Sequence, residues 1–167
     1  ARGAHGLDLH RRAGVGVAAV SPDRAAYFDY YERALYNHIL ASQEPRRGMF
    51  AYFMSLKPGH FKTYSSPDDS FWCCVGSGME NHTKYNDSIY FHGADSLYVN
   101  LFIPSRLKWE EKGLVLEQQT AYPRGGRVEL RFKTKGPVPL VLEVRTPQWA
   151  AGGLRLRLNG RSLRVES

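Results

Sequence analysis

The second half of the chain alternates apolar and polar residues with a period of two, and this pattern limits the fold more than any other feature. The alternation starts after Asp87 and recurs in short runs separated by turn residues. Each run predicts a strand with one buried and one solvated face, and such strands favour an antiparallel β-sandwich. Asn159-Gly160, between the last two runs, is a strong hairpin signal. The runs are Ile89–His92, Leu97–Ile103, Leu114–Leu116, Val128–Lys133, Leu140–Val144, Leu154–Leu158 and Leu163–Val165.

The segment before residue 45 carries a helical pattern instead. Its apolar positions recur three and four residues apart, and Pro22 suits the first turn of a helix. The helix should end by Glu44-Pro45, because the residue before a proline avoids helical backbone angles. Met49–Leu56 is expected to be extended, and residues 60–70 have the composition of a loop. The periodic positions are Phe28, Tyr31, Leu35 and Ile39.

Composition excludes several function classes. The 167 residues are 43% hydrophobic and 13% aromatic, so the chain can build a core and is not disordered. No run approaches the roughly 20 apolar residues of a spanning helix, so no membrane is expected as a partner. The net charge is +7, but the basic residues mostly alternate with apolar ones along strands instead of clustering. This pattern is typical of a solvated face and argues against a nucleic-acid partner.

Both cysteines of the chain stand side by side, at Cys73 and Cys74. Adjacent cysteines close only a strained disulfide ring, so two thiols or a metal-bound pair are expected. Ser77 and Glu80 have the spacing of a capping box, which predicts a helix over about residues 78–86. The thiols would lie just before that helix, where its dipole and free N–H groups stabilise a thiolate and lower a cysteine pKa.

The glycines on either side of Ser77 would let the backbone turn tightly enough to point both sulfurs toward one centre. In the alternative, the two cysteines are small hydrophobic side chains that fill a core beside Trp72. Trp72 itself could stack on a sugar ring, although a large aromatic beside a turn is more often part of a core. A zinc site also needs about four ligands, so the cysteine pair alone does not define one.

Other side chains admit both a functional and a structural role. Glu80 could be a catalytic carboxylate, but its place in the capping box favours a structural role. His82 and Tyr85 could face a sugar or form a polar helix face. His60 and His92 could be substitute metal ligands, and no spacing rule favours either one.

An ordered, collinear set of segments rich in rare residues runs from about Tyr27 to the C-terminus. It comprises Asp29–Gln43, Pro58–Lys62, Phe71–Asn81 and Tyr98–Ser105. In these segments the chain resembles the β-L-arabinofuranosidases of glycoside hydrolase family 127 and the related family 146. The resemblance implies a hydrolase that serves bacterial breakdown of arabinose-containing plant glycans.

The resemblance also implies an α+β fold, the C-terminal part of an (α/α)6 barrel followed by an incomplete antiparallel β-sandwich. The barrel segment would span residues 25–92 and the partial sandwich residues 93–167. Residues 1–24 contain no aromatic side chain and form an atypical leader, which is expected to be unrelated or out of frame and poorly packed. No credible signal peptide is present in this sequence, and the oligomeric state and compartment stay open.

Members of this group are similar in using a cysteine nucleophile bound to a zinc ion, which three cysteines and one glutamate hold. The resemblance assigns the nucleophile, itself a zinc ligand, to Cys73 and a second zinc ligand to Cys74. Cys73 would attack the anomeric carbon with overall retention, while a separate glutamate protonates the leaving oxygen.

The family's remaining zinc ligands, a Glu-x-Cys pair, and its acid/base glutamate lie upstream of the Tyr27 segment. No cysteine precedes Cys73, and residues 1–24 contain no glutamate. We therefore expect a truncated chain with an incomplete zinc site. The alternative function is a catalytically inactive fragment, a structural or carbohydrate-binding remnant of the family.

Overall fold

The computed structural model describes residues 15–19, 22–150, 152 and 154–163. The chain forms two compact units. The first, here the β unit, consists of Ala1–Phe28 and Ser88–Ser167, and the second, here the α unit, of Asp29–Asp87. Helices and strands are both well represented, so the expected α+β class is confirmed. No helix in the described part of the chain has the length and apolar character needed to cross a membrane.

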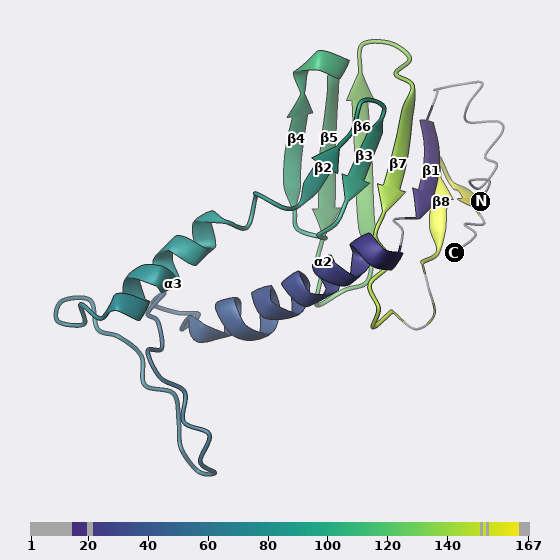
Figure 1. Ribbon diagram of the computed structural model, residues 1–167. Helices are drawn as coiled ribbons and strands as arrows, with labels where there is room; N and C mark the ends of the chain where they lie inside the picture. Colours follow the sequence, from purple (N-terminus) through teal and green to yellow (C-terminus); the bar gives the residue numbers. More distant parts are fainter. Residues whose placement is uncertain (1–14, 20–21, 151, 153, 164–167) are drawn as a thin grey trace. The chain divides into compact units, whose positions relative to one another are not determined.

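The β unit contains a mixed four-stranded sheet with the order β1-β7-β3-β2 (Figure 1). Its strands are β1 (Val15–Ala19), β7 (Leu140–Val144), β3 (Ser96–Val99) and β2 (Tyr90–His92). β1 and β3 both run parallel to β7, whereas β2 is antiparallel to β3. The expectation of purely antiparallel pairing is therefore wrong here. A long connection that contains the second sheet separates β3 from β7, and such a connection permits parallel pairing.

The second sheet of the β unit is antiparallel, with the order β4-β5-β6. It consists of β4 (Ser105–Trp109), β5 (Leu114–Thr120) and β6 (Val128–Thr134), and a short 3-10 helix, η3 (Glu110–Lys112), joins the first two. The alternation predicted β5 and β6. It did not predict β4, because the run expected over Leu97–Ile103 ends as a strand at Val99 and a new strand starts after Pro104.

The predicted hairpin is confirmed. Strands β8 (Leu156–Leu158) and β9 (Arg161–Leu163) pair antiparallel. The two residues between them have left-handed backbone angles, with φ of 48° at Asn159 and 83° at Gly160. This is the conformation that a two-residue hairpin requires and that Asn-Gly adopts at low cost. The continuation expected at Val165 lies outside the described residues.

One hydrophobic core serves both larger sheets of the β unit. Buried side chains from β3 and β7 pack against buried side chains from β4 and β5. The apolar residues of each alternating strand therefore point into the same core. The core members are Leu97, Val99, Phe102, Trp109, Leu114, Leu116, Leu140, Leu142 and Val144.

A polar residue at the edge of this core ties two segments together. Gln118 on β5 is only 2% exposed. Its amide nitrogen donates to the carbonyl oxygens of Leu101 at 3.1 Å and Ile103 at 2.9 Å, and it lies 3.1 Å from the Tyr90 hydroxyl. These contacts hold the irregular stretch between β3 and β4 against β5, where the sequence pattern predicted a continuous strand.

Replacing Gln118 with leucine is expected to destabilise the β unit by about 1–3 kcal/mol, because the change keeps the volume but leaves buried carbonyl groups unpaired. Urea unfolding followed by circular dichroism measures this. Gln119→Leu is the matched control, since Gln119 is exposed on the same strand. Equal stability of the two variants would show that the amide contributes no net stabilisation.

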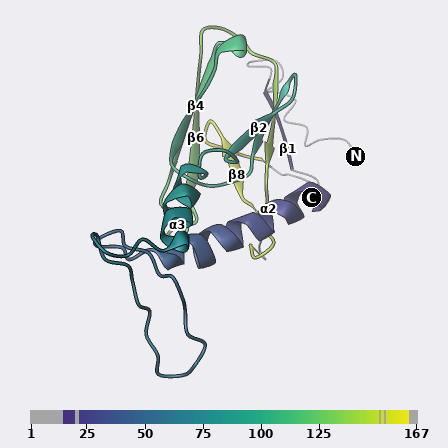
Figure 2. The ribbon, with the colours of Figure 1, turned by 60° about the vertical axis from the view of Figure 1, so that its left-hand side comes forward.

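The α unit is built from helices and a long loop. Helix α2 (Pro22–Ala34) begins in the β unit and continues as the π-helix η1 (Leu35–Ile39) and the 3-10 helix η2 (Leu40–Ser42). The predicted helix and its end before Pro45 are thus confirmed. Between η2 and helix α3 (Cys73–Thr83) the chain forms the long loop visible in Figure 2.

Two isolated antiparallel β-bridges pair residues of that segment. One joins Gln43 to Phe50, and the other joins Ala51 to Tyr64. Met49–Leu56 forms no strand and pairs only at the bridge residues Phe50 and Ala51, and the loop expected over 60–70 is confirmed.

The leader was expected to be poorly packed, yet residues 15–19 form strand β1. They pair with β7 in parallel over five positions, from Val15 opposite Leu140 to Ala19 opposite Val144. Residues 1–14, 20 and 21 of the expected leader lie outside the described residues, and residues 22–24 begin helix α2.

Candidate functional site

The two cysteines are the first two residues of helix α3. Both side chains are exposed and both are free thiols, and their sulfur atoms lie 3.7 Å apart. The alternative in which they fill a core is therefore wrong. Their position on the first turn places the sulfurs at the positive end of the helix dipole, among N–H groups that have no partner within the helix.

The capping box predicted at Ser77 and Glu80 is not formed. The helix begins five residues earlier than Gly78, and Trp72 is the N-cap without a side-chain hydrogen bond. Gly76 and Gly78 lie within the helix instead of making a turn before it. A serine and a glutamate three residues apart also share one face of a continuing helix, so the motif does not by itself mark a helix start.

Tyr52 is the neighbour of Cys73 that the sequence analysis missed. The negative charge of Cys73 raises the pKa of the Tyr52 hydroxyl, a hydrogen bond between the two groups adds to the shift, and the charge of Cys74 contributes further. Tyr52 therefore stays neutral as a donor toward the Cys73 sulfur. The only sequence signal at this position is the aromatic character of the Met49–Leu56 segment.

Trp72 lies beside Tyr52, the neighbour of Cys73. Its ring contacts the Tyr52 ring edge-on, with centroids 5.5 Å apart, and the side chain is 41% exposed. The expectation that this tryptophan belongs to a core is wrong. An exposed indole next to two thiols and a phenol offers an apolar face to a ligand.

The electrostatics of the thiol pair differ from the sequence prediction. The pKa of Cys74 is raised because its thiol shares a hydrogen bond with the Cys73 sulfur, with partial burial and the charge of Cys73 as smaller causes. The helix terminus was expected to lower a cysteine pKa, whereas the pKa of Cys74 is raised, chiefly by its hydrogen bond with Cys73. The pair therefore favours a single thiolate that accepts hydrogen bonds from its neighbours.

Tyr52→Phe is expected to slow alkylation of Cys73 by iodoacetamide at neutral pH by about tenfold, because a hydrogen bond to a charged sulfur is lost. Peptide mass spectrometry after timed labelling measures the rate at each cysteine. Tyr30→Phe removes a hydroxyl from a side chain that is 73% exposed on α2 and should leave the rate unchanged. A rate in Tyr52→Phe equal to that in Tyr30→Phe would contradict the proposed contact.

The cysteine pair has the spacing that zinc requires of two of its ligands. Tetrahedral zinc with sulfur ligands at about 2.3 Å holds two sulfurs about 3.8 Å apart, and the observed separation is 3.7 Å. Among the residues that the structure describes, no cluster of three or more metal-binding side chains forms. The two thiols thus fit half of a zinc coordination shell.

In the part of the chain that the structure describes, the remaining candidates form no metal-binding group of three or more side chains with the cysteines. His82 lies in the last turn of α3, about 13 Å along the helix from Cys73, and packs against Tyr85 with ring centroids 4.9 Å apart. Glu80 and His60 are exposed. His92, in the β unit, packs against Trp109 with ring centroids 4.7 Å apart.

Comparison with known families identifies the chain. A family model described as "Beta-L-arabinofuranosidase, GH127 catalytic domain" matches residues 17–87, and one described as "Beta-L-arabinofuranosidase, GH127 middle domain" matches residues 96–167. The two matches cover most of the sequence and place it among the glycoside hydrolases. The chain belongs to the GH127 β-L-arabinofuranosidase family. A search of curated proteins found no match. The catalytic-domain match contains Cys73, Cys74 and Tyr52.

Proposed function

We propose that Cys73 is the nucleophile of a retaining β-L-arabinofuranosidase that acts on arabinose-containing plant glycans. The observation that carries the proposal is the exposed thiol pair on the first turn of α3, with the hydroxyl of Tyr52 next to the Cys73 sulfur. A nucleophile needs access, a charged form and a fixed direction. Exposure gives the Cys73 thiol access to a substrate. The helix terminus and the Tyr52 hydroxyl stabilise the charged form of the thiol and fix the direction of the sulfur.

The proposed reaction has two steps. The Cys73 thiolate attacks the anomeric carbon of the furanoside, a C–S bond forms, and the C–O bond to the leaving group breaks. Water then attacks the same carbon and gives up a proton, which neutralises the departed oxyanion, and the electron pair of the C–S bond returns to the sulfur. Each step inverts the configuration, so the product retains that of the substrate. Tyr52 holds its proton throughout and donates a hydrogen bond to the Cys73 thiolate before the first displacement and after the second.

Cys73 and Cys74 are the residues that would hold zinc in this proposal. The ion would supply positive charge that favours a thiolate at neutral pH. The spacing of the two sulfurs supports this assignment. Trp72 would pack against the furanose ring beside the thiols, which its exposure and its contact with Tyr52 support.

The finer architecture is also part of the proposal. We assign α2 and α3 to the C-terminal part of an (α/α)6 barrel and the β unit to a β-sandwich of the middle domain. The shared core of the two larger sheets supports the second assignment. If the β unit is a single sandwich, it should unfold cooperatively. Disruption of the shared core should then abolish this cooperative unfolding.

The test is capture of the first covalent product. We would incubate the full chain, with and without added zinc, with a dinitrophenyl β-L-arabinofuranoside. Such a leaving group departs without help from an acid, so the first step depends on the nucleophile alone. A stoichiometric burst of dinitrophenolate and a pentosyl adduct on Cys73, found by peptide mass spectrometry, would support the proposal.

An adduct at any other residue would refute the role of Cys73. Absence of any adduct in zinc-replete buffer would favour the alternative of a catalytically inactive structural or carbohydrate-binding fragment. The α-linked arabinofuranoside with the same leaving group is the matched control and should give no adduct.

A further inference from the structure

A large cavity lies in the β unit along strand β6 and the β8–β9 hairpin. Its volume is about 1210 Å³. Val128, Leu130 and Phe132 of β6 line it and are only partly buried, whereas Leu116 of the neighbouring strand β5 is fully buried. Leu156 and Leu158 of β8 also line the cavity. The apolar side of β6 therefore borders an open space.

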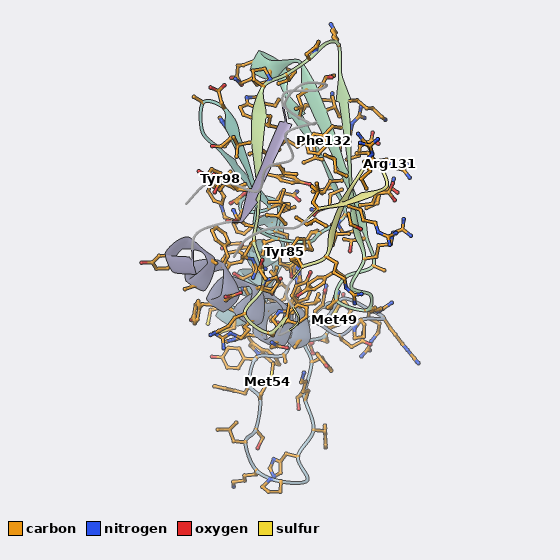
Figure 3. The ribbon with its side chains drawn as sticks, turned by 90° about the vertical axis from the view of Figure 1, so that its right-hand side faces the viewer. Met49, Met54, Tyr85, Tyr98, Arg131 and Phe132 are labelled. Atoms are coloured by element: carbon orange, nitrogen blue, oxygen red, sulfur yellow. The ribbon has the colours of Figure 1, made fainter. Side chains whose placement is uncertain are left out.

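The charged residues that line this cavity are strongly biased in sign. They comprise five cations, Arg127, Arg131, Lys133, Arg155 and Arg157, and the single carboxylate of Glu129. Figure 3 labels Arg131 and Phe132, adjacent residues of β6 that both line the cavity. Adjacent residues of a strand point to opposite faces, so the cavity borders both faces of β6 at its edge.

Three of the cations are already engaged on the sheet, the first of them Arg127, which lies 3.8 Å from Glu129. Arg131 lies 2.7 Å from Glu129, and Lys133 lies 2.8 Å from Glu117. Arg155 and Arg157 are exposed and take part in no ion pair among the residues that the structure describes. These two guanidinium groups are the available charge of the cavity.

We propose that this cavity binds an acidic oligosaccharide, one whose sugar rings carry carboxylates. Guanidinium groups bind carboxylates with two parallel hydrogen bonds, and the C–H faces of sugar rings pack against aliphatic and aromatic side chains. Cavities for single small ligands span about 300–1,000 Å³, so a volume of about 1210 Å³ accommodates more than one sugar ring. The choice of a sugar over another anion rests on the proposed function.

The experiment is calorimetric titration of the full chain with a tetramer of galacturonic acid. The matched ligand is the fully methyl-esterified tetramer, which has the same rings without charge. We expect the acidic tetramer to bind at least about tenfold more tightly and to lose affinity as salt concentration rises, because the cations are exposed. Equal affinity for the two tetramers, or no binding of either, would overturn the proposal.

Two variants test the site, one expected to weaken binding of the acidic tetramer and the other to strengthen it. Arg155→Gln combined with Arg157→Gln should weaken binding by about tenfold, and Glu129→Gln should strengthen it by about threefold, since it frees Arg131. Lys108→Gln combined with Arg124→Gln removes the same charge outside the cavity and should have no effect. Circular dichroism of each variant confirms that it is folded. The proposal fails if the Lys108→Gln, Arg124→Gln variant weakens binding as much as the Arg155→Gln, Arg157→Gln variant. That result would show that the tetramer responds only to the net charge of the protein.

Failure of this inference and failure of the proposed function are distinguishable. Binding does not involve the thiols, so Cys73→Ala should keep its affinity for the acidic tetramer while it loses the pentosyl adduct. Single-stranded DNA of matched charge serves as a second ligand. Equal affinity for DNA would show a general anion surface and would overturn the choice of a sugar, whatever the result at Cys73.

Discussion

Cys73→Ala is expected to abolish the pentosyl adduct and to lower kcat/KM for an activated aryl β-L-arabinofuranoside by at least about 10⁴-fold. Loss of a covalent nucleophile removes the reaction path and leaves only substrate binding. Both cysteine side chains are exposed, so the change should alter stability by less than about 0.5 kcal/mol. Release of the phenolate, followed against time at several substrate concentrations, measures the effect.

Cys74→Ala is the matched variant, because it removes the other member of the same exposed pair. It keeps the Cys73 thiol next to Tyr52 but removes half of the observed sulfur pair. We expect it to retain the adduct on Cys73 and to lose bound zinc, measured by elemental analysis after gel filtration. An adduct on Cys74 in the Cys73→Ala protein would reverse the two roles and contradict the assignment.

The sequence predicted the elements of the β unit better than their arrangement. A period of two predicts strands and their buried faces, and Asn159-Gly160 predicts a hairpin, because these depend on local geometry. Strand direction and partner depend on contacts between distant segments, which the alternation does not encode. The parallel pairing of β3 with β7 was missed for that reason. Strand β1 was missed because its sequence, VGVAA, carries no polar alternation.

At the candidate site, the adjacent thiols could be predicted and their surroundings could not. Tyr52 and Cys73 are separated by an irregular loop, and no periodicity relates two residues across such a segment. The sequence favours Gly76 and Gly78 as turn residues, whereas both lie within α3. A glycine that permits a turn and a glycine that permits close packing look the same in a sequence, and only the group opposite the glycine distinguishes them. Here the group opposite Gly78 is the ring of Phe50.

The role of these glycines leads to a pair of substitutions with opposite expected effects. A Cβ atom at Gly78 would lie 2.7 Å from Cδ1 and 2.9 Å from Cγ of Phe50. Phe50 is 6% exposed and cannot move freely, so Gly78→Ala should destabilise the α unit by about 1–3 kcal/mol. A Cβ atom at Gly76 meets nothing within 4 Å, and Gly76→Ala should stabilise the helix by about 0.5–1 kcal/mol.

Hydrogen exchange of the α3 amides measures both changes on the same helix. Gly78→Ala should also slow alkylation of Cys73, because Phe50 lies two residues before Tyr52 and a shifted ring moves the segment that carries the hydroxyl. Gly76→Ala should leave that rate unchanged. If alanine stabilises α3 equally at both positions, Phe50 does not pack against the helix, and the contact between Tyr52 and Cys73 loses its structural support.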